Sequence, residues 1–119
     1  MKKTVVLGAS PNPDRYSYKA IQALVEHGIE TMALGIKEGT VSGVRIAKEL
    51  VFPSDIDTVT LYVGPENQMQ WHDAILKMRP RRVIFNPGTE NPSFEQILKN
   101  EGIDVERACT LVLLATNQY

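Results

Sequence analysis

The sequence has little cysteine, no excess of charge of one sign and no long apolar run. Its single cysteine, Cys109, has no partner for a disulfide within the chain, which fits a reducing compartment and predicts a cytoplasmic protein. The longest apolar runs are Val5–Leu7 and Leu111–Ala115, whereas a membrane-spanning helix needs about 20 apolar residues. We therefore expect no disulfide framework and no membrane segment.

The charge balance gives no reason to expect nucleic acid as a partner. The chain has 13 basic and 14 acidic residues and a formal net charge of −1. A hydrophobic content of 43% is high enough for a packed core and excludes a disordered chain. One domain commonly takes roughly 100–200 residues, so the 119 residues predict a single domain over 1–119.

The first residues briefly imitate a signal peptide, because two lysines precede an apolar stretch. The stretch stops at Gly8, short of the roughly 7–15 residues that a secretory signal requires. We therefore interpret Thr4–Leu7 as a buried strand.

Short β-branched runs alternate with segments of helical periodicity along the chain. The expected strands are Thr4–Leu7, Ile29–Gly35, Val44–Ile46, Thr58–Val63, Arg82–Asn86 and Ile103–Val105. The expected helices are Asp14–His27, capped by Asp14 or Ser17 and ended by Gly28; a helix from Gly64-Pro65-Glu66 to Pro80; and Ser93–Glu101. This alternation predicts an α/β fold with a mainly parallel sheet and helices on both faces.

Some segments and helix faces are predicted less simply. The residues 35–43 are predicted as a loop, Pro53-Ser54-Asp55 as a turn, Ala47–Val51 is ambiguous, and Cys109–Thr116 fits either a helix or a strand. Helical spacing groups Ala20, Ile21, Leu24 and Val25; Met69, His72, Ile75, Leu76 and Arg79; and Phe94, Ile97 and Leu98, the last three of which are expected to point inward.

Ligands of open α/β sheets bind outside the carboxyl ends of the strands, near the point where the strand order reverses. That rule selects the loops Gly8–Ser17, Gly35–Gly39, Val63–Glu66 and Asn86–Pro92. The search for a site can therefore be limited to these four loops.

The first of these loops has the composition of a phosphate site. Gly8 and Ala9 allow a tight turn and a close backbone approach, and the helix that follows presents unpaired N–H groups. Ser10 and Ser17 add hydroxyls, and Arg15 adds a guanidinium suited to phosphate oxygens. The alternative is a plain strand-to-helix turn, with Ser17 as a cap and Arg15 as a surface charge.

The loop is not a dinucleotide fingerprint of the G-x-G-x-x-G type. The second and third glycine positions hold Ser10 and Pro13, and no acid for ribose hydroxyls ends the second strand. Lys37 stands near there instead, and a lysine suits a phosphate on the ribose, such as the 3′-phosphate of coenzyme A, better than a diol. The alternative for Lys37 is an ordinary surface lysine.

The stretch from Gly8 to Ser17 resembles the opening of the small single-domain CoA-binding proteins, relatives of the CoA-binding domain of the succinyl-CoA synthetase α subunit. Their pattern is a strand, then G-A-S-x-x-P-x-R-x-S, then a helix, and six residues match it in place: Gly8, Ala9, Ser10, Pro13, Arg15 and Ser17. The stretches Gly43–Pro53, Asp57–Tyr62 and Asn86–Asn91 also look like the family. Ala33-Leu34-Gly35-Ile36 departs from it, because many members have Pro-Val-Asn-Pro there.

This resemblance implies a Rossmann-like, doubly wound domain that binds coenzyme A or an acyl-CoA, and it implies no reaction. The expected cofactor-binding residues are Gly8, Ala9, Ser10, Pro11, Pro13, Arg15, Ser17, Gly35, Lys37, Val63, Gly64, Pro65 and Gly88. Arg15 and Ser17 would hold phosphate oxygens, and Lys37 would meet the 3′-phosphate. Val63–Pro65 would pack on the adenine or the pantetheine arm.

No residue pattern indicates catalysis or a metal site. His27 is expected to interact with a helix end, His72 to pack or face solvent, and Cys109 to be an inert thiol. Glu90 and Asn91 either contact a substrate or cap the next helix. His, Cys and Asp do not cluster at metal-ligand spacing.

Two other functions stay open beside a binding protein without catalysis. One is an NAD(P)-dependent oxidoreductase or a small acyl-CoA-utilising enzyme, because a fold does not fix a function. The other is a regulatory or interaction subunit that has lost its ligand, which the altered second-strand loop favours. The expected partner is a small-molecule nucleotide cofactor, and an exposed edge strand would allow a homodimer.

Overall fold

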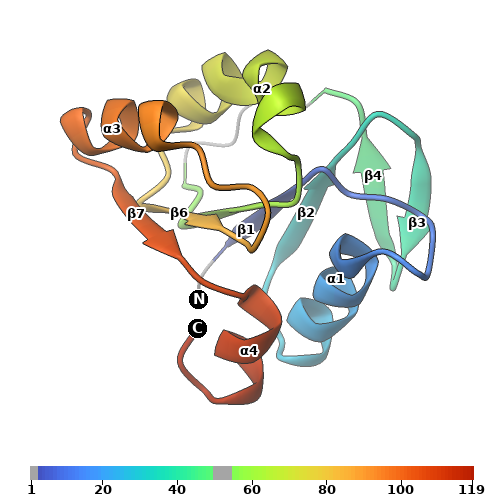
Figure 1. Cartoon of the computed structure of the whole chain (residues 1–119). Helices are drawn as coiled ribbons and strands as arrows, with labels where there is room; N and C mark the ends of the chain where they lie inside the picture. The colour runs from blue at the N-terminus through green and yellow to red at the C-terminus, as the bar shows by residue number, and fades with distance from the viewer. Residues whose placement is uncertain (1–2, 50–54) are drawn as a thin grey trace.

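The structure is a computed structural model that describes residues 3–49 and 55–119. In these residues the chain forms seven strands and four helices (Figure 1). The strands are β1 (Thr4–Leu7), β2 (Thr31–Leu34), β3 (Gly39–Val41), β4 (Val44–Ala47), β5 (Thr58–Leu61), β6 (Arg82–Phe85) and β7 (Asp104–Arg107). The helices are α1 (Tyr16–Glu26), α2 (Pro65–Met78), α3 (Pro92–Asn100) and α4 (Thr110–Ala115).

The strands form one sheet in the order β3-β4-β2-β1-β5-β6-β7. Each neighbouring pair is parallel except β3 with β4, which is antiparallel. The chain builds the sheet outward from β1 in one direction and then returns to its other side with β5. The fold is therefore a Rossmann-like α/β fold with a mainly parallel sheet, as the alternating pattern predicts. The strand order reverses between β1 and β5.

Helices cover both faces of the sheet, each over an apolar cluster. On one face, α2 and α3 contribute Ile75, Met78, Phe94 and Leu98 to a core that includes the fully buried Val59. On the other face, α1 and α4 contribute Ile21, Leu24 and Leu114, which pack with Val6 and Ile46. Figure 1 shows α2 and α3 on one side of the strands and α1 and α4 on the other. Alternating strand residues supply the two clusters, because successive side chains point to opposite faces.

The prediction of a loop over residues 35–43 is wrong at its second half. Gly39–Val41 forms β3, which pairs with β4 across a two-residue hairpin turn at Ser42 and Gly43. These two residues have φ angles of +49° and +81°, as a tight hairpin requires. Strand β3 has three residues and one apolar side chain, which is too few to show the periodicity of a strand. The turn residues Ser42 and Gly43 were the one sequence signal that could have indicated a hairpin here.

One prediction about a helix end and one about a strand end need correction. Helix α1 begins at Tyr16 after Arg15 as its N-cap residue, with no side-chain cap, so neither Asp14 nor Ser17 caps it. Gly28 follows its C-terminal end with a φ of +72°, as expected of a helix-ending glycine. The last strand, β7, extends to Arg107 rather than ending at Val105.

Helical spacing assigned some apolar residues to the wrong side. Ile97 was expected to point inward but is 47% exposed, and Val25 and Met69 are exposed as well. In α2 the buried positions are Gln68, Ile75 and Met78. The buried face of α2 therefore includes the polar Gln68, which a search for periodic apolar residues does not detect.

The ambiguous segment Cys109–Thr116 forms a helix. The Asn86 side chain, buried at the end of β6, accepts a hydrogen bond from the Thr110 backbone N–H at 2.9 Å and donates to Thr60 and to the Leu61 carbonyl. This buried amide fixes the start of α4 against β5 and β6. Local sequence carries no sign of it, since the interaction joins residues 24 positions apart.

Two sequence predictions lie partly outside the described residues. They are the turn at 53–55, of which only Asp55 is described, and the ambiguous segment after Ala47, of which positions 50 and 51 are not. Among the helices of the described residues, none is both long enough and apolar enough to cross a membrane.

Candidate functional site

The loop from Gly8 to Arg15 leaves β1 at the point where the strand order reverses. The backbone N–H groups of Gly8 and Ala9 both donate to the Leu34 carbonyl at 2.9 Å, which ties the loop to the end of β2. The Ser10 hydroxyl then accepts from the Asn12 N–H at 3.1 Å, and the Asn12 side chain accepts from the Asp14 N–H at 3.0 Å. The polar residues of this loop therefore fix its shape before any ligand is considered.

The loop packs against two of the other predicted loops through glycine. Gly8 has a φ of +91°, and a Cβ there would lie 2.5 Å from Val63 Cγ2 and 2.9 Å from the Tyr62 backbone. A Cβ on Gly35 would lie 2.3 Å from the Ala9 carbonyl oxygen. The structure thus brings together the ends of β1, β2 and β5. The close fit with Ala9 gives Gly35 a structural role besides the predicted ligand role.

The N-terminus of α1 is open to an anion. The backbone N–H groups of Tyr16, Ser17 and Tyr18 have no hydrogen-bond partner among residues 3–49 and 55–119, and the first turn contains no acid. By contrast, the first turns of α2 and α3 contain Glu66 and Glu95. Since a helix N-terminus carries a partial positive charge, α1 has unused capacity for a negative group beside the Gly8 turn.

The three side chains predicted to hold phosphates lie in different surroundings. Arg15 and Lys37 are exposed, and neither forms an ion pair within the described part of the chain. Ser17 is only 3% exposed at the second position of α1, so its backbone N–H is better placed for a ligand than its hydroxyl. Lys37 lies on the connection between β2 and β3, and no hydrogen bond or ion pair joins its side chain to the other predicted residues in the described structure.

The β5–α2 loop contains the next group of predicted residues. Val63 packs against the core on the α2 side, Gly64 is the N-cap residue of α2, and Pro65 occupies its first turn. Gly64 has a φ of −62°, which any residue can adopt, so the backbone conformation does not require a glycine at this position. Gly88, in the β6–α3 loop, has a φ of +93°, and its N–H donates to the Glu90 carboxylate at 2.9 Å.

Of the roles predicted for Glu90 and Asn91, capping of the next helix is confirmed for Asn91 and not for Glu90. Asn91 caps α3, because its side-chain oxygen accepts from the Phe94 N–H at 3.2 Å. Glu90 closes the turn at Gly88 through the hydrogen bond just described. Both residues therefore shape the β6–α3 loop.

Gln68 is a buried residue of the site that the sequence analysis missed. Its side-chain nitrogen donates to the Val63 carbonyl at 3.0 Å and to the Thr89 carbonyl at 2.9 Å. Its side-chain oxygen accepts from Asn91 at 3.1 Å and lies 3.0 Å from His72 Nε2. One fully buried amide thus joins the loop after β5 to the loop after β6. The sequence signal that could have indicated a buried Gln68 is its position on the same side of the helix as Ile75.

His72 packs against a neighbouring helix, a role that the sequence analysis favoured. Its ring stacks on Phe94 with centroids 3.6 Å apart, and its Nε2 carries a proton because it faces the amide oxygen of Gln68. Burial lowers the pKa of His72 below its ordinary value of 6.5, although the nearby Asp73 opposes the shift. His27 instead places Nδ1 2.7 Å from the Ala23 carbonyl in the last turn of α1.

This histidine predicts a pH dependence of stability. As the pH falls below about 6.5, the unfolded chain binds a proton that the folded chain, with its lowered pKa, resists, so the free energy of unfolding should decrease. Urea unfolding between neutral and mildly acidic pH measures this slope. The variant His72→Gln should flatten it, whereas His27→Gln, at an exposed position, should keep it. An unchanged slope in His72→Gln would assign the effect to other groups.

The remaining groups of chemical interest are the thiol of Cys109, the metal-ligating side chains and the phenol of Tyr62. Cys109 is a free, partly buried thiol that precedes α4. Within residues 3–49 and 55–119, no three His, Cys, Asp or Glu side chains gather where they could hold a metal ion. Burial raises the pKa of Tyr62, beside the Gly8 turn, to about 12, so its phenol stays neutral at ordinary pH.

Comparison with known proteins identifies the family of this site. The family model described as "CoA binding domain" matches residues 2–115. A solved structure called an uncharacterized protein is 46% identical, with a TM-score of 0.93, over 100% of this chain and 98% of that one. The comparison with curated proteins found no match.

Two further solved structures are less similar in sequence. A hypothetical protein from Pyrococcus horikoshii OT3 is 26% identical, with a TM-score of 0.84, over 93% of this chain and 80% of that one. A protein from Thermus thermophilus is 24% identical, with a TM-score of 0.85, over 99% of this chain and 90% of that one. The latter likeness shows the fold alone.

The fold and these matches define the class of the protein: a Rossmann-like α/β domain with a mainly parallel sheet. The chain belongs to the CoA binding domain family.

Proposed function

We propose that the chain binds coenzyme A or an acyl-CoA at the carboxyl ends of β1 and β5, without catalysis of its own. The observation that carries this proposal is the open N-terminus of α1 beside the Gly8 turn, in a chain of the CoA binding domain family. A pyrophosphate over Gly8–Ser10 would use the unpaired N–H groups of the first turn of α1. The charges of Arg15 and Lys37 support this anionic ligand.

The remaining predicted residues can be assigned to the phosphates, the ribose 3′-phosphate, and the adenine or the pantetheine arm. Arg15 precedes α1 and is exposed, so it is free to reach phosphate oxygens from one side of the loop. Lys37 follows β2 and is exposed, and it would meet the ribose 3′-phosphate. Val63–Pro65 would pack on the adenine or the pantetheine arm. Ser10 and Pro13 replace the fingerprint glycines, which favours CoA over NAD.

The proposal also covers the extent of the domain, the cell compartment and the oligomeric state. We propose one domain over residues 1–119, because the family match already spans nearly all of them. A single cysteine fits a reducing cytoplasm. The sheet ends at β3 and β7, and either edge strand could pair with a second copy in a homodimer.

Arg15→Ala is expected to weaken CoA binding roughly tenfold or more, because it removes a charge-assisted hydrogen bond to phosphate. Calorimetric titration of the full chain measures this loss. Lys77→Ala removes an exposed charge at the C-terminal end of α2 and should leave the affinity unchanged. Equal affinities of the Arg15→Ala variant and the unmodified chain would contradict the phosphate assignment.

Titration with dephospho-CoA and NAD extends the same experiment. The unmodified chain is expected to bind dephospho-CoA more weakly than CoA. If the Lys37→Ala variant binds the two ligands equally, Lys37 contacts the 3′-phosphate. Binding of NAD without CoA would instead favour an oxidoreductase. A folded chain that binds neither would favour a subunit that has lost its ligand.

A further inference from the structure

The edge strand β7 directs backbone hydrogen-bonding groups out of the sheet. Among the described residues it pairs with β6 alone. The N–H of Asp104 donates at 3.0 Å to the carbonyl just before β6, and the N–H of Ala108 donates at 3.3 Å to the last carbonyl of β6. Since backbone groups alternate sides along a strand, the even-numbered residues of β7 bond to β6. Val105 and Arg107 therefore direct their N–H and C=O groups outward.

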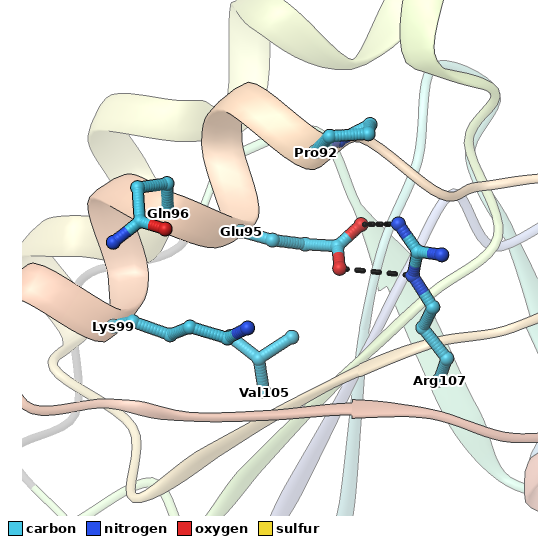
Figure 2. Close-up of a pocket in the computed structure, with 6 residues that line it drawn as sticks. All are labelled: Pro92, Glu95, Gln96, Lys99, Val105 and Arg107. Atoms are coloured by element: carbon cyan, nitrogen blue, oxygen red, sulfur yellow. Dashed lines mark hydrogen bonds and ion pairs between the residues drawn. The ribbon is translucent and has the colours of Figure 1, made fainter.

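The same two residues line a groove between β7 and α3. The groove has a volume of about 500 Å³, and Figure 2 shows its lining residues: Pro92, Glu95, Gln96, Lys99, Val105 and Arg107. In this view Val105 and Arg107 point from β7 towards α3. Extended peptides bind to sheet edges as an additional strand, with alternate side chains in pockets beside the edge. The groove lies where alternate side chains of such a strand would point.

The groove suits a short apolar side chain. The Glu95 side chain is only 8% exposed, and its two oxygens accept from Arg107 Nε at 2.9 Å and from Nη2 at 3.0 Å, so these two charges are already paired. Much of the remaining wall consists of Val105, Pro92 and the methylene groups of Lys99. Lys99 is exposed, and a long side chain of this kind can keep its ammonium in water.

The opposite face of β7 is acidic. The side chains of Asp104 and Glu106 are 74% and 39% exposed, and as alternate residues of the strand they point away from the groove. Arg81 lies 3.8 Å from Asp104 but pairs with Asp57 at 2.8 Å. Glu106 pairs at 3.2 Å with Arg82, whose side chain is buried. A strand added at this edge would therefore place two of its side chains opposite exposed carboxylates.

A second copy of β7 is a poor occupant of this edge. Two copies related by a two-fold axis would pair antiparallel, with the axis passing through one residue of β7. An axis at Val105 brings Asp104 and Glu106 of the two copies face to face, and an axis at any other residue of β7 brings that charged residue against itself. Like charges directly opposite each other are destabilising. This leaves β3 as the edge through which two copies could pair.

We propose that the outer edge of β7 binds an extended segment of a partner protein in which a short apolar residue stands between two basic residues. The segment would pair antiparallel with β7 through the backbone of Val105 and Arg107, with its apolar side chain in the groove. Its two basic side chains would lie opposite Asp104 and Glu106. The proposal is independent of CoA binding, because β7 lies three strands from β1.

The test is a titration of the full, isotope-labelled chain with the peptide acetyl-Thr-Lys-Val-Lys-Thr-amide, followed by backbone NMR at constant ionic strength. Saturable shifts in β7 and α3 are expected, together with slower amide exchange at Val105 and Arg107. A peptide N-methylated at its valine lacks the N–H that faces β7 and should not bind, whereas N-methylation at a lysine, whose N–H faces solvent, should be tolerated. Equal binding of the two methylated peptides, or no saturation by the unmethylated one, would overturn strand addition.

A charge reversal tests the chemistry of the partner. Asp104→Lys should weaken binding of the basic peptide roughly fivefold and favour acetyl-Thr-Glu-Val-Glu-Thr-amide instead. Glu26→Lys makes the same change of charge at the exposed end of α1 and should affect neither peptide. An unchanged Asp104→Lys variant, or equal binding of the acidic peptide to the unmodified chain, would contradict a basic partner. Self-association that protects the Val105 and Arg107 amides without peptide would replace the partner by a second copy.

Discussion

Gly8→Ala is expected to destabilise the fold by about 3 kcal/mol or more and to abolish CoA binding. The left-handed backbone of Gly8, with a φ of +91°, costs an alanine roughly 1–2 kcal/mol. In addition, the new Cβ would lie 2.9 Å from the Tyr62 backbone and 2.5 Å from Val63. Backbone atoms cannot turn away as a flexible side chain can, so either β1 or β5 must shift, at a cost of roughly 1–3 kcal/mol. Urea unfolding and calorimetry measure the two losses.

Gly28→Ala is the matched control for this prediction. Gly28 has a similar φ of +72°, but among the described residues, its own chain neighbours aside, no atom lies within 4 Å of the position that its Cβ would take. Its alanine variant should therefore show the backbone cost alone, about 1 kcal/mol, and keep its affinity for CoA. If both variants lose the same stability, close packing at the reversal of strand order contributes nothing and the argument from contact is wrong.

The sequence predicts the central parallel strands β1, β5 and β6 because these strands are buried on both faces. A run such as Thr58–Leu61 has no exposed residue, and its β-branched composition is typical of such a strand. Strand β3 was missed for the opposite reason. It lies at the border of the sheet, has one fully buried residue and depends on its hairpin partner β4.

The site could be predicted only as far as local chemistry determines it. The motif at Gly8 identifies the turn, because its φ requires glycine, and the family match agrees with the motif. For Gly35 the sequence suggested a ligand, whereas the structure shows the Ala9 carbonyl where a Cβ would be. Close approach of two backbones and close approach of a ligand demand the same residue, so sequence alone does not separate them.

The ion pair between Glu95 of α3 and Arg107 of β7 shows another limit of sequence reasoning. Glu95 and Arg107 are 12 residues apart, and each alone is an ordinary charged residue of a helix or a strand. Their pairing depends on how α3 crosses the edge of the sheet. Ion pairs between elements are a property of tertiary structure, and no local pattern predicts them.

The second large effect is expected from Gln68→Leu, which should lower the free energy of unfolding by about 3–5 kcal/mol. Leucine has nearly the same size, so the change removes hydrogen bonds without leaving a cavity. The Val63 and Thr89 carbonyls lose their donor, and the Asn91 amide and His72 lose their acceptor. Each buried polar group left unpaired costs roughly 1–3 kcal/mol, which makes this substitution worse than the loss of one contact. Urea unfolding measures the change.

Two control variants test whether the loss of stability comes from the hydrogen bonds of Gln68. Gln70→Leu controls for the effect of a leucine on helix propensity, and Gln68→Glu controls for the size of the side chain. Gln70 is exposed on the same helix and donates only to the Asn67 carbonyl, so its leucine variant should change stability little. Gln68→Glu keeps the size but places a carboxylate against the two carbonyls, so it should destabilise the fold at neutral pH and recover in part as acid protonates it. A stable Gln68→Leu variant with unchanged CoA affinity would mean that the loops after β5 and β6 hold their positions independently. If stability and affinity fall together, the buried amide positions both loops for the ligand.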